Sequence, residues 1–195
     1  MTRKIGILAL QGAFREHRQA LESLGCEVAE VRKPGDLDGI NGLIIPGGES
    51  TTMGKLLQVD DLGEKIKRLA KNNLPIFGTC AGMIVLSKNI EGSDQYRLGL
   101  MDVTVQRNAF GRQIASFETD LEIPALGQGP VRAVFIRAPY IKNVAPNVGI
   151  LAEYEKKIVF ARQGNMIASA FHPELTKDRR VHQYFLSIVD EQLAK

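Results

Sequence analysis

The segment that most constrains the fold is Gly78–Gly82, Gly-Thr-Cys-Ala-Gly, which directly follows the apolar run Leu74–Phe77. Such a run, ending in a cysteine between two glycines, predicts a buried strand, a sharp turn and a helix over residues 81–86. The glycines leave room where this turn brings backbone close to backbone. The pattern therefore predicts a nucleophile elbow, with the Cys80 thiol at a helix N-terminus that favours the thiolate. The alternative is a structural cysteine buried between packing glycines.

A second cluster of chemically active residues lies near the C-terminus, where Phe171-His172-Pro173-Glu174 follows the strand-like residues 165–169. Pro173 favours an extended backbone at His172, and side chains two positions apart in an extended segment point to the same side. We therefore expect the Glu174 carboxylate beside the His172 imidazole. A cysteine nucleophile needs a base and a group that orients the base, so Cys80, His172 and Glu174 are candidates for a triad. The alternative is a surface turn with a solvated histidine.

A third candidate element is the pair Gly47-Gly48, which follows the apolar run Leu43–Ile45 and Pro46. Consecutive glycines leave backbone N–H groups uncovered, and such groups stabilise the oxyanion of acyl transfer. A phosphate-binding loop is a weaker interpretation, because the glycine and lysine spacing of such loops is absent. An ordinary turn before a helix is the other alternative.

The residues after this glycine pair predict the start of a helix that continues through Met53 to Leu57. Ser50 or Thr51 is the expected N-cap, since hydroxyl side chains accept hydrogen bonds from the free N–H groups of a first helical turn. Glu49 is then available to meet a cationic group on a substrate.

The alternation of strands and helices predicts an α/β fold. The first half alternates strand-like and helical segments, which predicts a doubly wound parallel sheet whose ligands bind beyond the carboxyl ends of the strands. The second half is rich in short strand-like runs, which predict antiparallel additions. We therefore expect a single-domain, three-layer α/β/α, flavodoxin-like sheet. The expected strands are 4–10, 27–32, 43–45, 74–77, 103–106, 114–121, 131–137, 150–154, 157–161 and 165–169, and the expected helices are 14–24, 50–72 with a start near 50, 81–86 and a closing helix after 177.

The composition is that of one globular domain over residues 1–195, with 44% hydrophobic and 24% charged residues. A formal net charge of +3 gives no support to nucleic-acid binding. The apolar stretches are strand-sized and the N-terminus lacks a signal-peptide core, so we expect a cytoplasmic protein without a membrane partner. Cys26 is expected to be a buried bystander without a disulfide. With three histidines and no ligand-spacing motif, we expect no metal or other cofactor.

Taken together, these motifs resemble the class I glutamine amidotransferases, and among them the glutaminase subunits of pyridoxal 5'-phosphate synthases. The elbow and His-Pro-Glu point to the superfamily, and the other motifs narrow the resemblance to this family. Ala109 departs from the serine usual there and leaves the candidate triad intact. The resemblance extends over the whole chain and rests on Leu8–Ala13 with Arg15–His17, Pro46–Met53, Gly78–Gly82, Arg107–Gln113, Phe135–Pro139 and Phe171–Leu175.

The resemblance implies that Cys80 attacks the side-chain amide of L-glutamine, with His172 and Glu174 completing the triad. Glutamate and ammonia would form through a thioester, and a partner, the ammonia-accepting pyridoxal 5'-phosphate synthase subunit, would use the ammonia for vitamin B6 biosynthesis. Backbone N–H groups at Gly48 and Ala81 would hold the oxyanion. The implied glutamine contacts are Gly48, Glu49, Ser50, Arg107, Ile136 and Arg137.

Two other functions remain open at this point. A cysteine, histidine and glutamate do not identify the acyl group, so a stand-alone peptidase or thioesterase fits the same residues. A non-catalytic binding or regulatory module that retains the fold is the second alternative. We also expect the glycine-rich loop at Gly47-Gly48 to become ordered only on the partner, because glycine has high conformational freedom.

Overall fold

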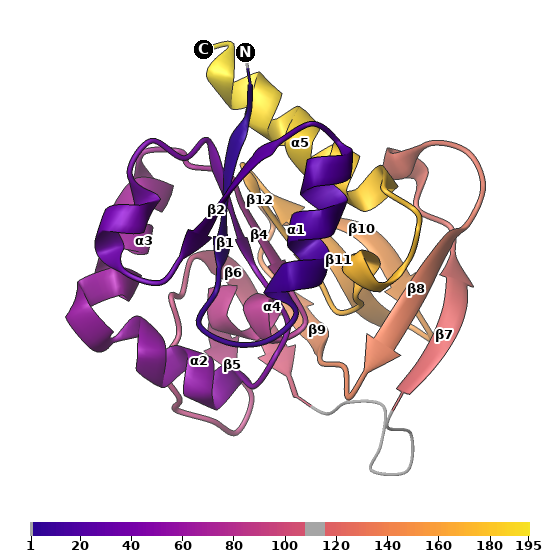
Figure 1. Cartoon of the computed structure of the whole chain (residues 1–195). Helices are drawn as coiled ribbons and strands as arrows, with labels where there is room; N and C mark the ends of the chain where they lie inside the picture. Colours follow the sequence, from indigo (N-terminus) through magenta and orange to yellow (C-terminus); the bar gives the residue numbers. More distant parts are fainter. Residues whose placement is uncertain (1, 108–115) are drawn as a thin grey trace.

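The structure is a computed structural model that describes residues 2–107 and 116–195 (Figure 1). Its first half alternates strands and helices, as the sequence predicts. The helices and strands are β1 Lys4–Leu8, α1 Phe14–Ser23, β2 Glu27–Val31, β3 Gly42–Ile45, α2 Ser50–Leu57, α3 Leu62–Lys71, β4 Ile76–Thr79, α4 Ala81–Leu86, β5 Ser87–Ile90, β6 Met101–Gln106, β7 Ser116–Leu121, β8 Val131–Ile136, β9 Tyr140–Val144, β10 Gly149–Tyr154, β11 Lys157–Gln163, β12 Met166–Ser169 and α5 Arg180–Leu193.

Most of the described strands form one sheet in the order β2-β1-β3-β4-β12-β11-β9-β6-β5, with β10 paired to β11. Strands β2, β1, β3, β4 and β12 run parallel to one another. Strands β11, β9 and β6 continue the sheet with antiparallel pairs. A separate antiparallel pair, β7 with β8, stands at the side of this sheet (Figure 1). The predicted parallel sheet with antiparallel additions is confirmed.

Helices cover both faces of the parallel strands. On β3 and β4, Gly42 faces Phe185 and Val189 of α5, and Phe77 contacts Phe185 at a ring-centroid distance of 5.8 Å. The next residue along β4, Gly78, faces α4 instead. Because successive residues of a strand point to opposite faces, α5 and α4 lie on opposite sides of the sheet. This arrangement is the predicted three-layer order.

Helix boundaries differ from the sequence prediction at two places. The helical stretch after residue 50 is two helices, α2 and α3, because Asp60 and Asp61 between them have positive φ values of 52° and 59°. Helix α5 begins at Arg180 rather than at 177, since the Asp178 carboxylate accepts hydrogen bonds from the backbone N–H and the guanidinium of Arg180.

Two strands were not predicted. Strand β5 contains Ser, Lys and Asn, which lack the pattern of a strand, and it pairs with β6. Strand β9 lies between β6 and β11 and supplies the link that joins the antiparallel half into the sheet. Of the expected strand 114–121, the structure describes 116–121. Within the described ranges, no helix is long and apolar enough to cross a membrane.

Candidate active site

The carboxyl ends of adjacent parallel strands bring the predicted site residues together. Cys80 directly follows β4, Gly47-Gly48 follows β3, and His172 comes three residues after β12. Since β3, β4 and β12 are neighbours in the sheet, their ends lie at one edge. A Cβ atom built on Gly47 would lie 2.5 Å from His172 Cε1 and 3.4 Å from Cys80 Cβ. Only glycine therefore fits between the loop and these two side chains.

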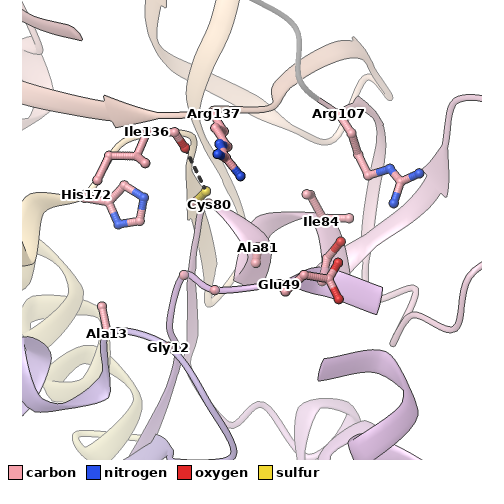
Figure 2. Close-up of a pocket in the computed structure, with 13 residues that line it drawn as sticks. Gly12, Ala13, Glu49, Cys80, Ala81, Ile84, Arg107, Ile136, Arg137 and His172 are labelled. Atoms are coloured by element: carbon pink, nitrogen blue, oxygen red, sulfur yellow. Dashed lines mark hydrogen bonds between the residues drawn. The ribbon is translucent and has the colours of Figure 1, made fainter. Parts of the chain in front are cut away.

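Cys80 occupies the sharp turn that its sequence predicts. Its backbone has φ 50° and ψ −104°, a conformation that is costly for any residue with a side chain and that often marks functional sites. The turn is tight because Gly78 and Gly82 pack on each other, and a Cβ on Gly82 would lie 1.9 Å from the Ile45 carbonyl oxygen. Cys80 is 7% exposed, and its Sγ lies 3.9 Å from the Ile136 carbonyl oxygen (Figure 2).

His172 and Glu174 form the pair that the sequence predicts, but the backbone conformation that brings them together differs from the expected one. His172 Nδ1 lies 2.7 Å from Glu174 Oε1, and both side chains are buried. The expected extended segment is wrong beyond His172, because Pro173–Leu175 form a 3₁₀ turn. Proline begins such a turn readily, and the turn brings the carboxylate back under the imidazole. The backbone N–H of His172 donates to the Val134 carbonyl at 2.8 Å, which fixes the segment to β8.

The electrostatics of this cluster favour a charged pair. Burial acts to lower the pKa of His172, but hydrogen bonds to Cys80 and Glu174, together with their charges, raise it to about 10. Burial acts to raise the pKa of Glu174, and the neighbouring His17 and His172 outweigh burial and lower it. An imidazolium between sulfur and carboxylate is therefore the favoured state. Such a group can deliver a proton to a leaving group.

The N-cap of α2 is Glu49, and the predicted cap at Ser50 or Thr51 is wrong. Glu49 has extended φ and ψ, and its carboxylate accepts hydrogen bonds from the N–H groups of Thr51 and Thr52 at 3.0 and 2.7 Å. These bonds lower the pKa of Glu49 to about 2. Ser50 instead turns its hydroxyl toward Gln95 Oε1 at 3.5 Å. The Glu49 carboxylate reaches the free N–H groups of both Thr51 and Thr52, whereas the Ser50 hydroxyl bonds to neither.

The described site residues line one cavity of about 510 Å³ (Figure 2). Figure 2 shows Cys80 at its centre, with His172 on one side and Arg137 on the other. Arg107 donates to Gln95 Oε1 at 2.7 Å, and Arg137 has a positive φ of 44°. All predicted site residues except Glu174 line this cavity, namely Gly48, Glu49, Ser50, Cys80, Ala81, Arg107, Ile136, Arg137 and His172.

Comparisons with known proteins agree with this geometry. Residues 7–191 match the SNO glutamine amidotransferase family. The chain belongs to this family. A protein of Moorella thermoacetica and one of Desulforamulus reducens, both named pyridoxal 5'-phosphate synthase subunit PdxT, are 61% and 62% identical over 95% of this chain and 99% and 98% of their own lengths. A crystal structure of a glutamine amidotransferase matches with 49% identity and a TM-score of 0.90, over 95% of this chain and 98% of that one.

The sequence predicted no role for some residues at this site of the SNO family chain. Gly12, Ala13 and Ile84 line the cavity, and the Ala13 N–H donates to the Gly47 carbonyl at 3.2 Å. His17 lies behind Glu174, and its place in the Arg15–His17 motif is the one sequence signal for it. Of the segment 107–113, Arg107 is described, and residues 108–113, with Ala109, lie outside the described residues. Within the described ranges, no group of three or more His, Cys, Asp or Glu is arranged to hold a metal ion.

Proposed function

We propose that this chain hydrolyses L-glutamine to glutamate and ammonia through a thioester on Cys80. The observation that carries the proposal is the position of His172. Its Nδ1 lies 2.7 Å from Glu174 Oε1, and its ring lies with Cys80 against the same residue, Gly47. Membership of a glutamine amidotransferase family supports glutamine as the source of the acyl group. Cys80, His172 and Glu174 then act as nucleophile, proton carrier and orienting carboxylate.

The reaction proceeds in two halves. The Cys80 thiolate adds to the side-chain amide carbon, and the resulting oxyanion accepts hydrogen bonds from the backbone N–H groups of Gly48 and Ala81. Protonated His172 gives its proton to the amide nitrogen, so the C–N bond breaks and ammonia leaves. Neutral His172 then removes a proton from water, which attacks the thioester. The C–S bond breaks, glutamate leaves, and the sulfur and imidazole return to their first state.

The charges of the cavity fit the free amino acid. Glutamine carries an α-carboxylate and an α-ammonium, which need a cationic and an anionic or carbonyl partner. Arg107 and Arg137 supply guanidinium groups. Glu49 supplies a carboxylate whose Oε1 accepts one hydrogen bond, from Thr51 N–H, and retains a lone pair, whereas Oε2 accepts from both the N–H and the hydroxyl of Thr52. Ser50 and the backbone of Gly48 and Ile136 complete the glutamine contacts. A peptide would lack one or both of these end charges, so this cavity favours free glutamine.

The partner follows from the fate of ammonia. Ammonia released into water is protonated and diluted, so a glutaminase of this kind is useful when it delivers ammonia directly to an acceptor enzyme. The relatives are named as subunits of pyridoxal 5'-phosphate synthase, so the proposed partner is the ammonia-accepting synthase subunit. The proposed location is the cytoplasm, with residues 1–195 acting as one glutaminase domain.

Glutamate release with and without the purified synthase subunit tests the proposal. We expect slow turnover alone and faster turnover with the partner, and loss of turnover in Cys80→Ala and His172→Asn. Cys26→Ala is the matched control, because Cys26 is also buried and free but lies outside the cavity. Full turnover without the partner would instead favour a stand-alone hydrolase. Absence of 6-diazo-5-oxonorleucine labelling at Cys80, even beside the synthase, would favour a non-catalytic module.

A further inference from the structure

Two of the three histidines of the chain face one side chain, Glu174, and the third contacts one of these two. His172 faces one oxygen of Glu174, His17 faces the other, and His182 contacts His17. They come from three different parts of the fold, because His17 lies on α1, His182 on α5, and His172 after β12. The proposed reaction uses one of the three. The other two are fully buried polar side chains whose role the mechanism above does not explain.

His17 is enclosed between three polar partners. Its Nδ1 lies 3.0 Å from His182 Nε2, and its Nε2 lies 3.2 Å from Thr79 Oγ1. The same Nε2 lies 3.4 Å from Glu174 Oε2, the carboxylate oxygen that His172 does not use. This is an electrostatic contact, and Oε2 accepts no hydrogen bond within the described structure. His17 thus touches both the residue before the nucleophile and the residue that orients the base.

The contacts select one tautomer of His17. If Nδ1 carried the proton, the lone pair of Nε2 would face the Glu174 carboxylate at 3.4 Å, and a buried anionic oxygen would meet a second negative end. His182 would then also hold a buried N–H at Nδ1, an atom without a hydrogen-bond partner among the described residues. With the proton on Nε2, the N–H dipole points toward Thr79 and Glu174, and His182 donates from Nε2 to His17. The unpartnered atom is then a neutral acceptor, which costs less than an unpaired charge.

We propose that His17, set in its Nε2–H tautomer by His182, is a positioning residue that keeps Glu174 ionised with Oε1 aimed at His172. The inference rests on the proposed glutaminase chemistry, since it assigns a role to a residue behind the triad. Each carboxylate oxygen then faces one imidazole, Oε1 within hydrogen-bond distance of His172 and Oε2 at 3.4 Å from His17, so rotation of Glu174 would lose both contacts. Without His17, one oxygen of a buried carboxylate faces no donor, and its protonation becomes easier.

The surrounding charges agree with neutral His17 and His182. Burial lowers the pKa of both, against the charge of Glu174, and His182 falls to about 3. Both rings are therefore neutral near physiological pH and donate one proton each. The charged and titratable groups that act on this pair are Glu174 and His172 from the segment after β12, Glu16 from α1, and Arg179 from the start of α5.

Nitrogen NMR of the histidine-labelled chain tests the tautomer directly and without substrate. The chain has three histidines, so each ring can be assigned from single substitutions. At neutral pH we expect His17 and His182 to carry their proton on Nε2. A proton on Nδ1 of His17 would overturn the proposal, whatever the enzymatic activity.

Alkylation of Cys80 by iodoacetamide tests the positioning role. His17→Leu removes the N–H at similar volume, whereas His17→Gln returns an N–H the same number of bonds from the backbone. In His17→Leu we expect the pH midpoint of alkylation to rise by about one unit, because a less ionised Glu174 stabilises the imidazolium–thiolate pair less. His17→Gln should recover most of that shift. Peptide mapping separates Cys80 from Cys26.

Phe185→Leu is the matched control. Phe185 is buried on α5 beside Phe77, and none of the described hydrogen bonds, ion pairs or ring contacts joins it to Glu174 or His17. It should leave the midpoint unchanged. An unchanged midpoint in His17→Leu, or an equal shift in Phe185→Leu, would overturn the positioning role. A third outcome separates the two proposals. If the wild-type chain releases no glutamate even with the synthase subunit, but His17→Leu alone shifts the midpoint, the positioning role is supported and only the proposed function is rejected.

Discussion

The backbone N–H of Cys80 donates to the carbonyl oxygen of Ser169 at 2.8 Å, so the nucleophile's turn is bonded to the last residue of β12. His172 follows that strand by three residues. The pairing of β4 with β12 therefore sets the distance between nucleophile and base before either side chain is considered. Residues about ninety positions apart in the chain meet through one parallel strand pair. Changes that loosen the elbow should consequently act on both stability and catalysis.

Gly82→Ala should destabilise the chain strongly. The added Cβ would lie 1.9 Å from the Ile45 carbonyl oxygen, a backbone atom that moves only with β3. We expect the free energy of unfolding to fall by about 2–4 kcal/mol in urea titrations, as for other overpacked cores. Gly35→Ala is the control, since no atom of residues 2–107 or 116–195 lies within 4 Å of a Cβ there. Equal stability of the two variants would refute the close packing of α4 on β3.

Glu49→Ala should weaken the start of α2. The carboxylate caps the N–H groups of Thr51 and Thr52, and loss of an N-cap costs about 1 kcal/mol of unfolding free energy. Because folding lowers the pKa of Glu49 to about 2, its contribution is present above the ordinary value of 4.5 and is lost as pH falls toward 2. The difference in unfolding free energy between wild type and variant should therefore become smaller as the pH falls.

Urea unfolding at neutral pH and in acid measures this difference, with Glu118→Ala as the control. Glu118 is exposed on β7, away from any helix N-terminus. A Glu49→Ala variant as stable as Glu118→Ala at neutral pH would contradict the capping role.

The candidate nucleophile, its turn and the parallel half of the sheet were predictable from local sequence. Cys80 lies between glycines after an apolar strand, and each of these features acts within a few residues. The cap of α2 was not predictable in the same way. Ser50 and Thr51 are common caps, and the choice of Glu49 depends on the Gln11 and Gln95 side chains that hold the loop from elsewhere in the chain.

The side chains behind the triad were also beyond local sequence. His17 lies on the buried face of α1, where a histidine gives no sign of its partner. Its contact with Glu174 joins residues far apart in the chain and depends on where α1 packs against the 3₁₀ turn. Strand β9 was missed for a related reason. Its residues are mixed in polarity, and its assignment as a strand comes from the neighbours β6 and β11.

Arg107→Met should weaken glutamine binding more than it slows the chemical steps. The guanidinium lines the cavity and is held by Gln95 at 2.7 Å, and under the proposed function we expect it to meet the α-carboxylate rather than the reacting amide. We expect KM for glutamine to rise about tenfold or more with a smaller change in kcat, as expected when uniform binding is lost. Steady-state glutamate release with the synthase subunit present measures both.

Arg132→Met is the control for this change. Arg132 is an exposed arginine on β8 that pairs with Asp120, outside the cavity. An unchanged KM in Arg107→Met, or the same rise in Arg132→Met, would show that Arg107 does not contact glutamine.

His182→Phe should flatten the acid dependence of stability. Folding lowers the pKa of His182 from 6.5 to about 3, so below 6.5 the unfolded chain binds a proton that the folded chain does not. Stability therefore falls as pH falls through this window, by about 1.4 kcal/mol per pH unit for this one side chain. Phenylalanine cannot bind that proton, so the slope of unfolding free energy against pH should decrease by about that amount.

Urea unfolding between about pH 6.5 and pH 4.5 measures this effect as the difference in slope from wild type, because His17, whose pKa burial also lowers, contributes to the slope in both chains. Folding lowers the pKa of Glu174, so the stability that this carboxylate adds is lost only below its ordinary value of 4.5. Folding raises the pKa of His172 to about 10, so its contribution is complete below 6.5 and is lost only as pH rises toward 10. Phe185→Leu should lower stability equally at each pH. A slope in His182→Phe as steep as in the wild type would show that His182 is not held neutral by its burial beside His17.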